Sequence, residues 1–249
     1  MTKEKILVTA ALPYVNNIPH IGNIVGSHLP ADIFARFMRI NGYYVKFIGG
    51  ADEHGTPIEV AAIKKNLTPK ELCDYYYEIH KKIYDWFNFS YDNFSRTSKE
   101  IHHKITQEFF IEIYKNGYIK EGKILLPYCE NCNRVLPDRY VIGICPYCGY
   151  ENARGDQCEK CGNILNPTDL KNMKCTICGS SPKIVEKEHL FFDIKKLKNE
   201  LKEWIESKKG IMRQGVINES LAWIDTLKER CITRDLRWGV KVPLEKFKD

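Results

Sequence analysis

The stretch Thr9-Ala-Ala-Leu-Pro-Tyr-Val-Asn-Asn-Ile-Pro-His-Ile-Gly-Asn23 decides how the beginning of this chain folds. The residues just before it, 6–8, form a short apolar run that is typical of a buried strand. After it, apolar residues recur at helical spacing over 21–41, which predicts a helix. The chain is therefore expected to pass from a strand, through a turn that contains proline, into a helix.

This helix start predicts a binding site for an anion. The first N–H groups of a helix have no partner within the helix, and the helix dipole is positive there. His20 and Asn23 are three residues apart, so their side chains project to one side and can both reach a phosphate. Gly22 lies between them and lets a ligand approach the backbone. Taken alone, this pattern is more often an ordinary helix start.

A second strand is predicted over 44–48, followed by Asp52-Glu-His-Gly-Thr-Pro57 and a helix that runs through Asn66. Strands and helices in alternation imply an α/β fold with a parallel sheet and right-handed crossovers. Ligands of such sheets bind beyond the carboxyl ends of the strands, where the loops converge. We therefore expect Tyr14, His20 and Asn23 to lie close to Asp52 and His54.

Two further helices are predicted as scaffold, one opened by Thr68-Pro-Lys-Glu71 and one from about Lys99 to Asn116. No G-x-G-x-x-G motif follows the first strand, which counts against a dinucleotide cofactor.

Eight of the ten cysteines form four Cys-x-x-Cys pairs in a segment that is poor in apolar residues. Two such pairs complete a tetrahedral zinc site, and a site of four cysteines leaves no position open for catalysis. The spacing therefore predicts one or two structural zinc ions, although it leaves both sequential and nested pairing possible. The four pairs are Cys129/Cys132, Cys145/Cys148, Cys158/Cys161 and Cys175/Cys178.

Composition places the chain among ordinary soluble proteins. Of its 249 residues, 43% are hydrophobic and 28% charged, which is enough for one large or two small domains. No signal peptide and no membrane span are expected, so we predict a cytoplasmic location and metal in place of disulfides. The net charge of +6 permits contact with RNA but does not by itself indicate it.

His20-Ile-Gly-Asn23 resembles the His-Ile-Gly-His signature of class I aminoacyl-tRNA synthetases. Together with Ala11-Leu-Pro-Tyr-Val-Asn16 and Gly50-Ala-Asp-Glu-His-Gly-Thr-Pro57, it is similar to the methionyl-tRNA synthetase family. The fourth signature position carries Asn23 instead of histidine. Asparagine donates hydrogen bonds but cannot hold a positive charge, so phosphate stabilisation there is expected to be weaker or shared.

The resemblance implies a Rossmann-like catalytic domain that carries a small zinc-knuckle insertion. The first half of the catalytic domain would span 1–117, the zinc module 118–188, and a helical segment leading back to the catalytic fold 189–249. Nested pairing is implied, with Cys145, Cys148, Cys158 and Cys161 on one ion and Cys129, Cys132, Cys175 and Cys178 on the other.

The resemblance also implies the substrates and the residues that would hold them. ATP with magnesium would be bound by Asn16, His20, Gly22 and Asn23, of which His20 and Asn23 would also stabilise charge during catalysis. Methionine would be bound by Leu12, Tyr14 and Asp52, with Asp52 on the ammonium group. The implied reaction is activation of methionine and its transfer to tRNA(Met).

The sequence departs from the family by lacking a Lys-Met-Ser-Lys-Ser-like loop and the later strands. We therefore expect an amino-terminal fragment with little or no activity alone. Two other functions stay open: a zinc-ribbon RNA-binding module without catalysis, or another nucleotidyltransferase. Arg234-Asp235 either reaches the substrates or forms a surface salt bridge.

Overall fold

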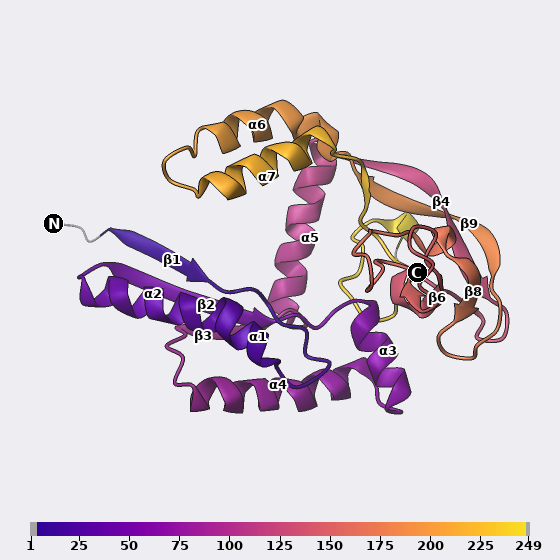
Figure 1. The fold of residues 1–249 in the computed structure, drawn as a ribbon, viewed down its shortest axis with the longest axis horizontal. Coiled ribbons are helices and arrows are strands. Elements are labelled where there is room, and N and C mark those ends of the chain that lie inside the picture. The colour runs from indigo at the N-terminus through magenta and orange to yellow at the C-terminus, as the bar shows by residue number, and fades with distance from the viewer. Residues whose placement is uncertain (1–3, 248–249) are drawn as a thin grey trace.

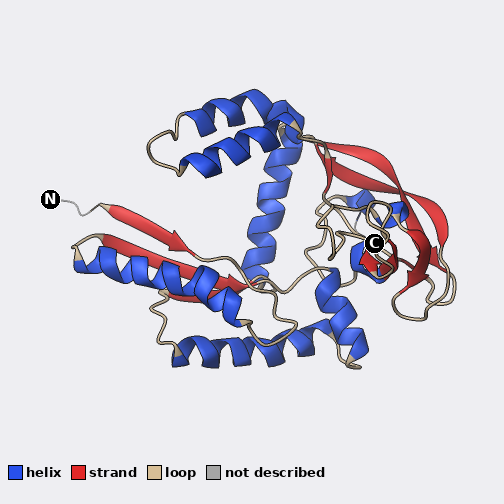
Figure 2. Ribbon diagram, viewed as in Figure 1, coloured by secondary structure: helices blue, strands red, loops and turns tan. Residues whose placement is uncertain are grey.

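The structure is a computed structural model that describes residues 4–247. It contains three sheets, which Figures 1 and 2 show with their helices. The first sheet has the order β1-β2-β3, the second β10-β9-β4-β5 and the third β7-β6-β8. The first sheet lies in the amino-terminal part of the chain, and the third lies in the segment that contains the cysteine pairs. The second combines the strands that flank this segment with β10, which comes later in the chain.

The first sheet is parallel, as predicted. β1 (Lys5–Thr9) pairs with β2 (Tyr44–Ala51), which pairs in turn with β3 (Asn93–Arg96). The crossover from β1 to β2 consists of α1 (Ile21–Asn23), the π-helix η1 (Ile24–His28) and α2 (Leu29–Ile40). The crossover from β2 to β3 consists of α3 (Thr56–Lys64) and α4 (Pro69–Trp86).

The helix predicted over 21–41 is present, but it is interrupted at its start by the π-helix over Ile24–His28. Within α2, Ile33 and Phe37 are 58% and 59% exposed, whereas Ala35 is fully buried against β2. One face of β1 is likewise uncovered within residues 4–247, where Leu7 is 65% exposed.

A buried ion pair ties the end of β2 to the end of β3. The Glu53 side chain is completely buried, and one carboxylate oxygen lies 2.6 Å from Nε of Arg96. The hydroxyl of Ser98 donates to the other oxygen, and the Glu53 N–H donates to Thr97 at 2.9 Å. Burial of a carboxylate is costly without such donors, so this cluster fixes the loop that follows β2.

After β3, α5 (Glu100–Lys115) leads to a long antiparallel ribbon of β4 (Ile119–Cys129) and β9 (Lys183–Phe192). Between these strands lies a compact module whose core combines the cysteines with apolar side chains such as Leu136, Tyr140 and Leu170. Its remaining elements are η2 (Asp138–Tyr140), η3 (Pro167–Asp169) and the strands β5 (Arg134–Val135), β6 (Val141–Ile144), β7 (Ala153–Arg154) and β8 (Lys171–Cys175).

After β9 the chain continues with η4 (Ile194–Leu197) and a helical hairpin of α6 (Lys198–Glu206) and α7 (Gln214–Asp225), which pack through Ile205, Ile217 and Ile224. β10 (Arg230–Cys231) then pairs with β9, and η5 (Glu245–Phe247) ends the described residues. Over residues 4–247, no helix has the length and apolar character needed to cross a membrane.

The cysteine-containing module is joined to the parallel-sheet region at Glu59 of α3, which is 4% exposed. Its carboxylate accepts hydrogen bonds from the Tyr140 hydroxyl at 2.5 Å and from Arg134 at 3.1 Å, both in the module. It also accepts from the backbone N–H groups of Arg237 and Trp238 at 2.9 and 2.8 Å. We refer to these five residues as the Glu59 junction.

The buried pair of Glu53 and Arg96 gives a first prediction. Arg96→Met leaves the Glu53 carboxylate buried without its cation, so the free energy of unfolding should fall by about 3 kcal/mol. Lys104→Met is the control, because Lys104 and Glu108 form an exposed pair at 3.9 Å, and it should change stability by less than about 0.5 kcal/mol. Urea unfolding followed by circular dichroism measures both values. Equal stability of the two variants would contradict the assignment.

Candidate active site and cysteine clusters

The loops that follow β1 and β2 meet, as predicted for a parallel sheet. Tyr14 and Asp52 form a parallel β-bridge beyond the ends of their strands. The Asp52 N–H donates to the Pro13 carbonyl at 2.9 Å, and the Val15 N–H donates to the Asp52 carbonyl at 3.3 Å. The backbone therefore holds the predicted methionine-binding segment, which includes Leu12, directly beside Asp52.

His20 and Asn23 cap the helix start reciprocally. His20 Nδ1 accepts the Gly22 N–H at 2.9 Å, and Asn23 Oδ1 accepts the His20 N–H at 3.1 Å. These bonds leave Nε2–H of His20 and the amide NH₂ of Asn23 as donors, and both residues are exposed. The close packing also explains Gly22, because a Cβ there would lie 3.0 Å from His20 Nδ1.

The Asp52 carboxyl group is half-buried, and among the described residues no lysine or arginine pairs with it. Burial raises its pKa, and the neighbouring Glu53 contributes in the same direction. A half-buried carboxylate without a cation in its own chain is suited to an ammonium group from a ligand. Asn16, which the resemblance implies for ATP, lies in the same loop and is partly buried.

The cysteine-containing module approaches this loop. Burial and the Asp52 carboxylate raise the pKa of Tyr14, while Arg139 of the module opposes the shift and Asp156 and Asp138 add to it. Arg139 and Asp156 form an ion pair with 2.8 Å between nitrogen and oxygen. Charged groups of the module are therefore close enough to act on the loop that contains Tyr14.

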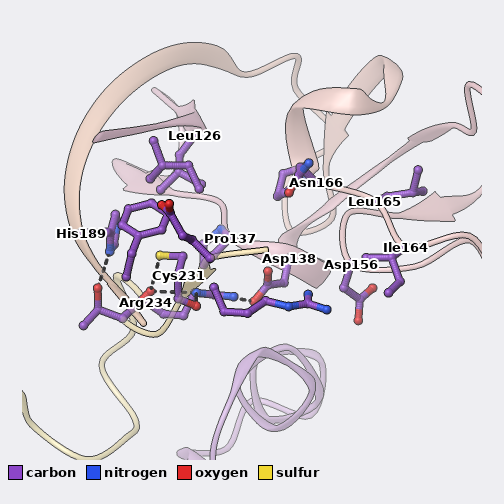
Figure 3. Close-up of a pocket in the computed structure, with 16 residues that line it drawn as sticks. Leu126, Pro137, Asp138, Asp156, Ile164, Leu165, Asn166, His189, Cys231 and Arg234 are labelled. Carbon is purple, nitrogen blue, oxygen red and sulfur yellow. Dashed lines mark hydrogen bonds and ion pairs between the residues drawn. The ribbon is translucent and has the colours of Figure 1, made fainter. Parts of the chain in front are cut away.

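A cavity of about 310 Å³ lies between the module, the ribbon and β10 (Figure 3). Arg234 lines it and binds the Asp138 carboxylate at 3.0 Å and the carbonyls of Cys231 and Thr233 at 3.0 and 2.9 Å. Arg234 thus forms an ion pair with the module, which is one of the two possibilities that the sequence left open. Asp235 instead lies 3.3 Å from Nε2 of the buried His189.

The cysteines form two clusters, and the grouping is the nested one. Within each cluster the four sulfur atoms lie within 4.8 Å of one another, with individual contacts from 3.4 to 3.9 Å. Four thiolates at about 2.3 Å from a zinc ion are about 3.8 Å apart, so both clusters fit one tetrahedral ion. The members are Cys145, Cys148, Cys158 and Cys161 in one cluster and Cys129, Cys132, Cys175 and Cys178 in the other.

One thiol in each cluster is held toward the thiolate form that metals bind. The Asn163 backbone N–H, with its side chain, lowers the pKa of Cys161 to about 6. The Ser180 hydroxyl and backbone N–H lower the pKa of Cys178 to about 6. The chemistry and the spacing of both clusters therefore fit structural zinc.

Each Cys-x-x-Cys pair is followed directly by a residue whose backbone adopts the left-handed conformation, with positive φ. Gly149, Gly162 and Gly179 have φ angles of +72°, +74° and +75°, and Asn133 takes the same place in the first pair with φ +47°. Each of the three glycine N–H groups also donates to the carbonyl of the first cysteine of its pair. Glycine and asparagine adopt this conformation more readily than other residues.

The structure adds residues that the sequence did not single out. Glu59, Tyr140 and Arg134 join the module to the sheet region, and His103 contacts His54. Their contacts span tens of residues along the chain, so no local spacing marks them.

The loops of the parallel sheet thus bring Asp52 beside Tyr14, in the segment that leads into the His20-capped helix start, and the inserted module has two cysteine clusters that fit zinc. The sequence profile described as tRNA synthetases class I (M) matches residues 6–249. The chain belongs to this family, within the group of the methionyl-tRNA synthetases.

Similar proteins agree with this placement. The chain is 48% identical to the cytoplasmic methionine–tRNA ligase of Arabidopsis thaliana, with 99% of this chain and 32% of that protein covered. It is 47% identical to the methionine–tRNA ligase of Aeropyrum pernix, with 97% and 42% covered, and 46% identical to the human cytoplasmic protein, with 99% and 28% covered. The chain thus spans between about a quarter and two fifths of these relatives.

The fold itself matches a solved structure of Mycobacterium tuberculosis methionyl-tRNA synthetase in complex with methionyl-adenylate. The TM-score is 0.70, with 21% sequence identity, and the match covers 98% of this chain and 43% of that one.

The cysteine clusters give a second prediction. The purified chain should contain two zinc ions, and Cys158→Ser should lower this to one, because three thiolates no longer complete the site. Cys231→Ala is the control, since Cys231 lies outside both clusters, and it should keep two ions. Elemental analysis measures the content. Removal of zinc by a chelator should also unfold the module while the parallel sheet persists, because metal-binding energy is folding energy there.

Two zinc ions in the Cys158→Ser protein would contradict the assignment of this cysteine as a ligand.

Proposed function

We propose that the protein acts in the ATP-dependent activation of methionine to methionyl-adenylate and in its transfer to tRNA(Met). The observation that carries the proposal is the half-buried Asp52 carboxylate, which pairs with no lysine or arginine of the described residues and lies beside the loop that ends in the capped helix start. One end of this arrangement suits an ammonium group and the other suits phosphates. Because the chain spans only part of its relatives, it would supply this part of the site within the longer reaction machinery.

In the proposed reaction the methionine carboxylate attacks the α-phosphorus of ATP. A carboxyl–phosphate bond forms, and the bond to pyrophosphate breaks. No protein nucleophile is needed, so the chain acts by positioning the reactants and stabilising phosphate charge. His20 and Asn23 would donate to the phosphates of ATP through their free N–H groups, next to Gly22 and Asn16. Magnesium would accompany the ATP.

Methionine would be held on the other side of the loop. Asp52 would bind its ammonium group, the Leu12 backbone carbonyl would accept from the same group, and Tyr14 would lie along its side chain. Tyr14 is 48% exposed, which leaves its ring accessible to a ligand.

We further propose that two structural zinc ions stabilise the module and that the domains are 1–117, 118–188 and 189–249. β9 runs from Lys183 to Phe192, so the last limit falls within a strand that connects the two segments. A cytoplasmic location is proposed from the relatives that are named cytoplasmic.

The test is binding of a non-hydrolysable methionyl-adenylate analogue to this chain, measured by calorimetry. Asp52→Asn removes a charged hydrogen-bond acceptor worth about 1.5–3 kcal/mol, so the affinity should fall by roughly 10- to 100-fold. Asp85→Asn is the matched control, because Asp85 is exposed on α4, and it should bind like the unaltered chain.

Unchanged affinity of Asp52→Asn would refute the role of Asp52. Binding of tRNA without any binding of the analogue or of ATP would instead favour the zinc-ribbon RNA-binding alternative.

A further inference from the structure

Two histidines from different elements face each other at the edge of the site. His54 lies in the loop after β2, and His103 lies in the first turns of α5. Their Nε2 atoms are 3.2 Å apart, and their ring centroids are 5.0 Å apart. The proposed function uses neither side chain.

This geometry matches two ligands of one metal ion. An ion about 2.05 Å from each nitrogen, with a nitrogen–metal–nitrogen angle of about 100°, gives nitrogens about 3.2 Å apart and ring centroids about 5 Å apart. The same angle therefore reproduces both observed distances. Without an ion, one ring must instead carry its proton on Nε2 and donate it to the other ring.

The surroundings leave room for an ion and its remaining ligands. Both rings are partly exposed, and His54 lines a cavity of about 630 Å³ together with Gln107 and Trp238. No aspartate or glutamate of the described residues forms an ion pair with either ring. His102 is exposed on the neighbouring position of α5. Among the described residues it forms neither a hydrogen bond nor a ring contact with His54, although it lies close enough to act on that ring through its charge.

We propose that His54 and His103 form a binding site for a divalent transition-metal ion, separate from both cysteine clusters. Neutral imidazole is a preferred ligand of zinc, nickel and copper, and two imidazoles leave the other positions to water or to a bound ligand. The ion would tether the loop after β2 to α5, two residues from Asp52. It would thereby stabilise the folded chain against heat.

The experiment titrates Ni²⁺ into the untagged, zinc-loaded chain and follows heat by calorimetry and zinc release with a chromogenic dye. One equivalent of Ni²⁺ should bind without release of zinc, and the melting temperature should rise. His103→Gln should weaken this binding by about tenfold or more, because one of the two protein ligands is lost. His102→Gln is the matched control on the same helical turn and should bind Ni²⁺ like the unaltered chain.

His54→Gln is the second variant and should weaken binding to a similar degree, with circular dichroism confirming the fold of each protein. The proposal would be overturned if Ni²⁺ bound only by displacing zinc. It would also be overturned if His103→Gln and His102→Gln bound Ni²⁺ equally well.

Discussion

The arrangement of this molecule depends on the hydrogen bonds that the buried Glu59 carboxylate accepts. It is nearly completely buried, yet it receives hydrogen bonds from Tyr140, Arg134 and the two backbone N–H groups of Arg237 and Trp238. A buried carboxylate is costly unless such donors satisfy it, and removal of some donors leaves the charge uncompensated. The three segments that contribute to the junction are therefore held in one arrangement.

This constraint explains how the cysteine-containing module is held beside the loops of the parallel sheet. The module has its own core around the cysteines, and Val60 of α3 packs against that core. The Glu59 junction fixes where that module lies, with η2 against α3 and its charged residues near Tyr14. The site then combines a helix start, a free carboxylate and charges of the module. In the proposed reaction each of these elements would act by position and electrostatics, because the substrates would provide the nucleophile.

Local sequence patterns were sufficient to predict the parallel sheet, the proximity of Tyr14 to Asp52 and the helix start at His20. Each follows from short-range rules about strand order, turns and caps. The Cys-x-x-Cys spacing predicted zinc, whereas the nested grouping came from the family resemblance and is confirmed by the sulfur positions.

The features that the sequence did not predict also have specific physical causes. The sequence predicted one helix over 21–41, whereas Ile24–His28 form a π-helix that no residue pattern indicated. Glu59 looked like an ordinary charged residue of α3. Its partners are 75 to 179 residues away, so its role is visible only when the chain is folded. For the same reason the sequence left both possibilities open for Arg234, whose ion-pair partner Asp138 lies in the module.

Amide hydrogen exchange at Trp238 tests the role of the junction most directly, since this N–H donates to the Glu59 carboxylate. In Glu59→Ala the account predicts faster exchange at Arg237 and Trp238, with unchanged exchange in the β1–β2 pairs. Equal protection of Trp238 with and without the carboxylate would contradict it.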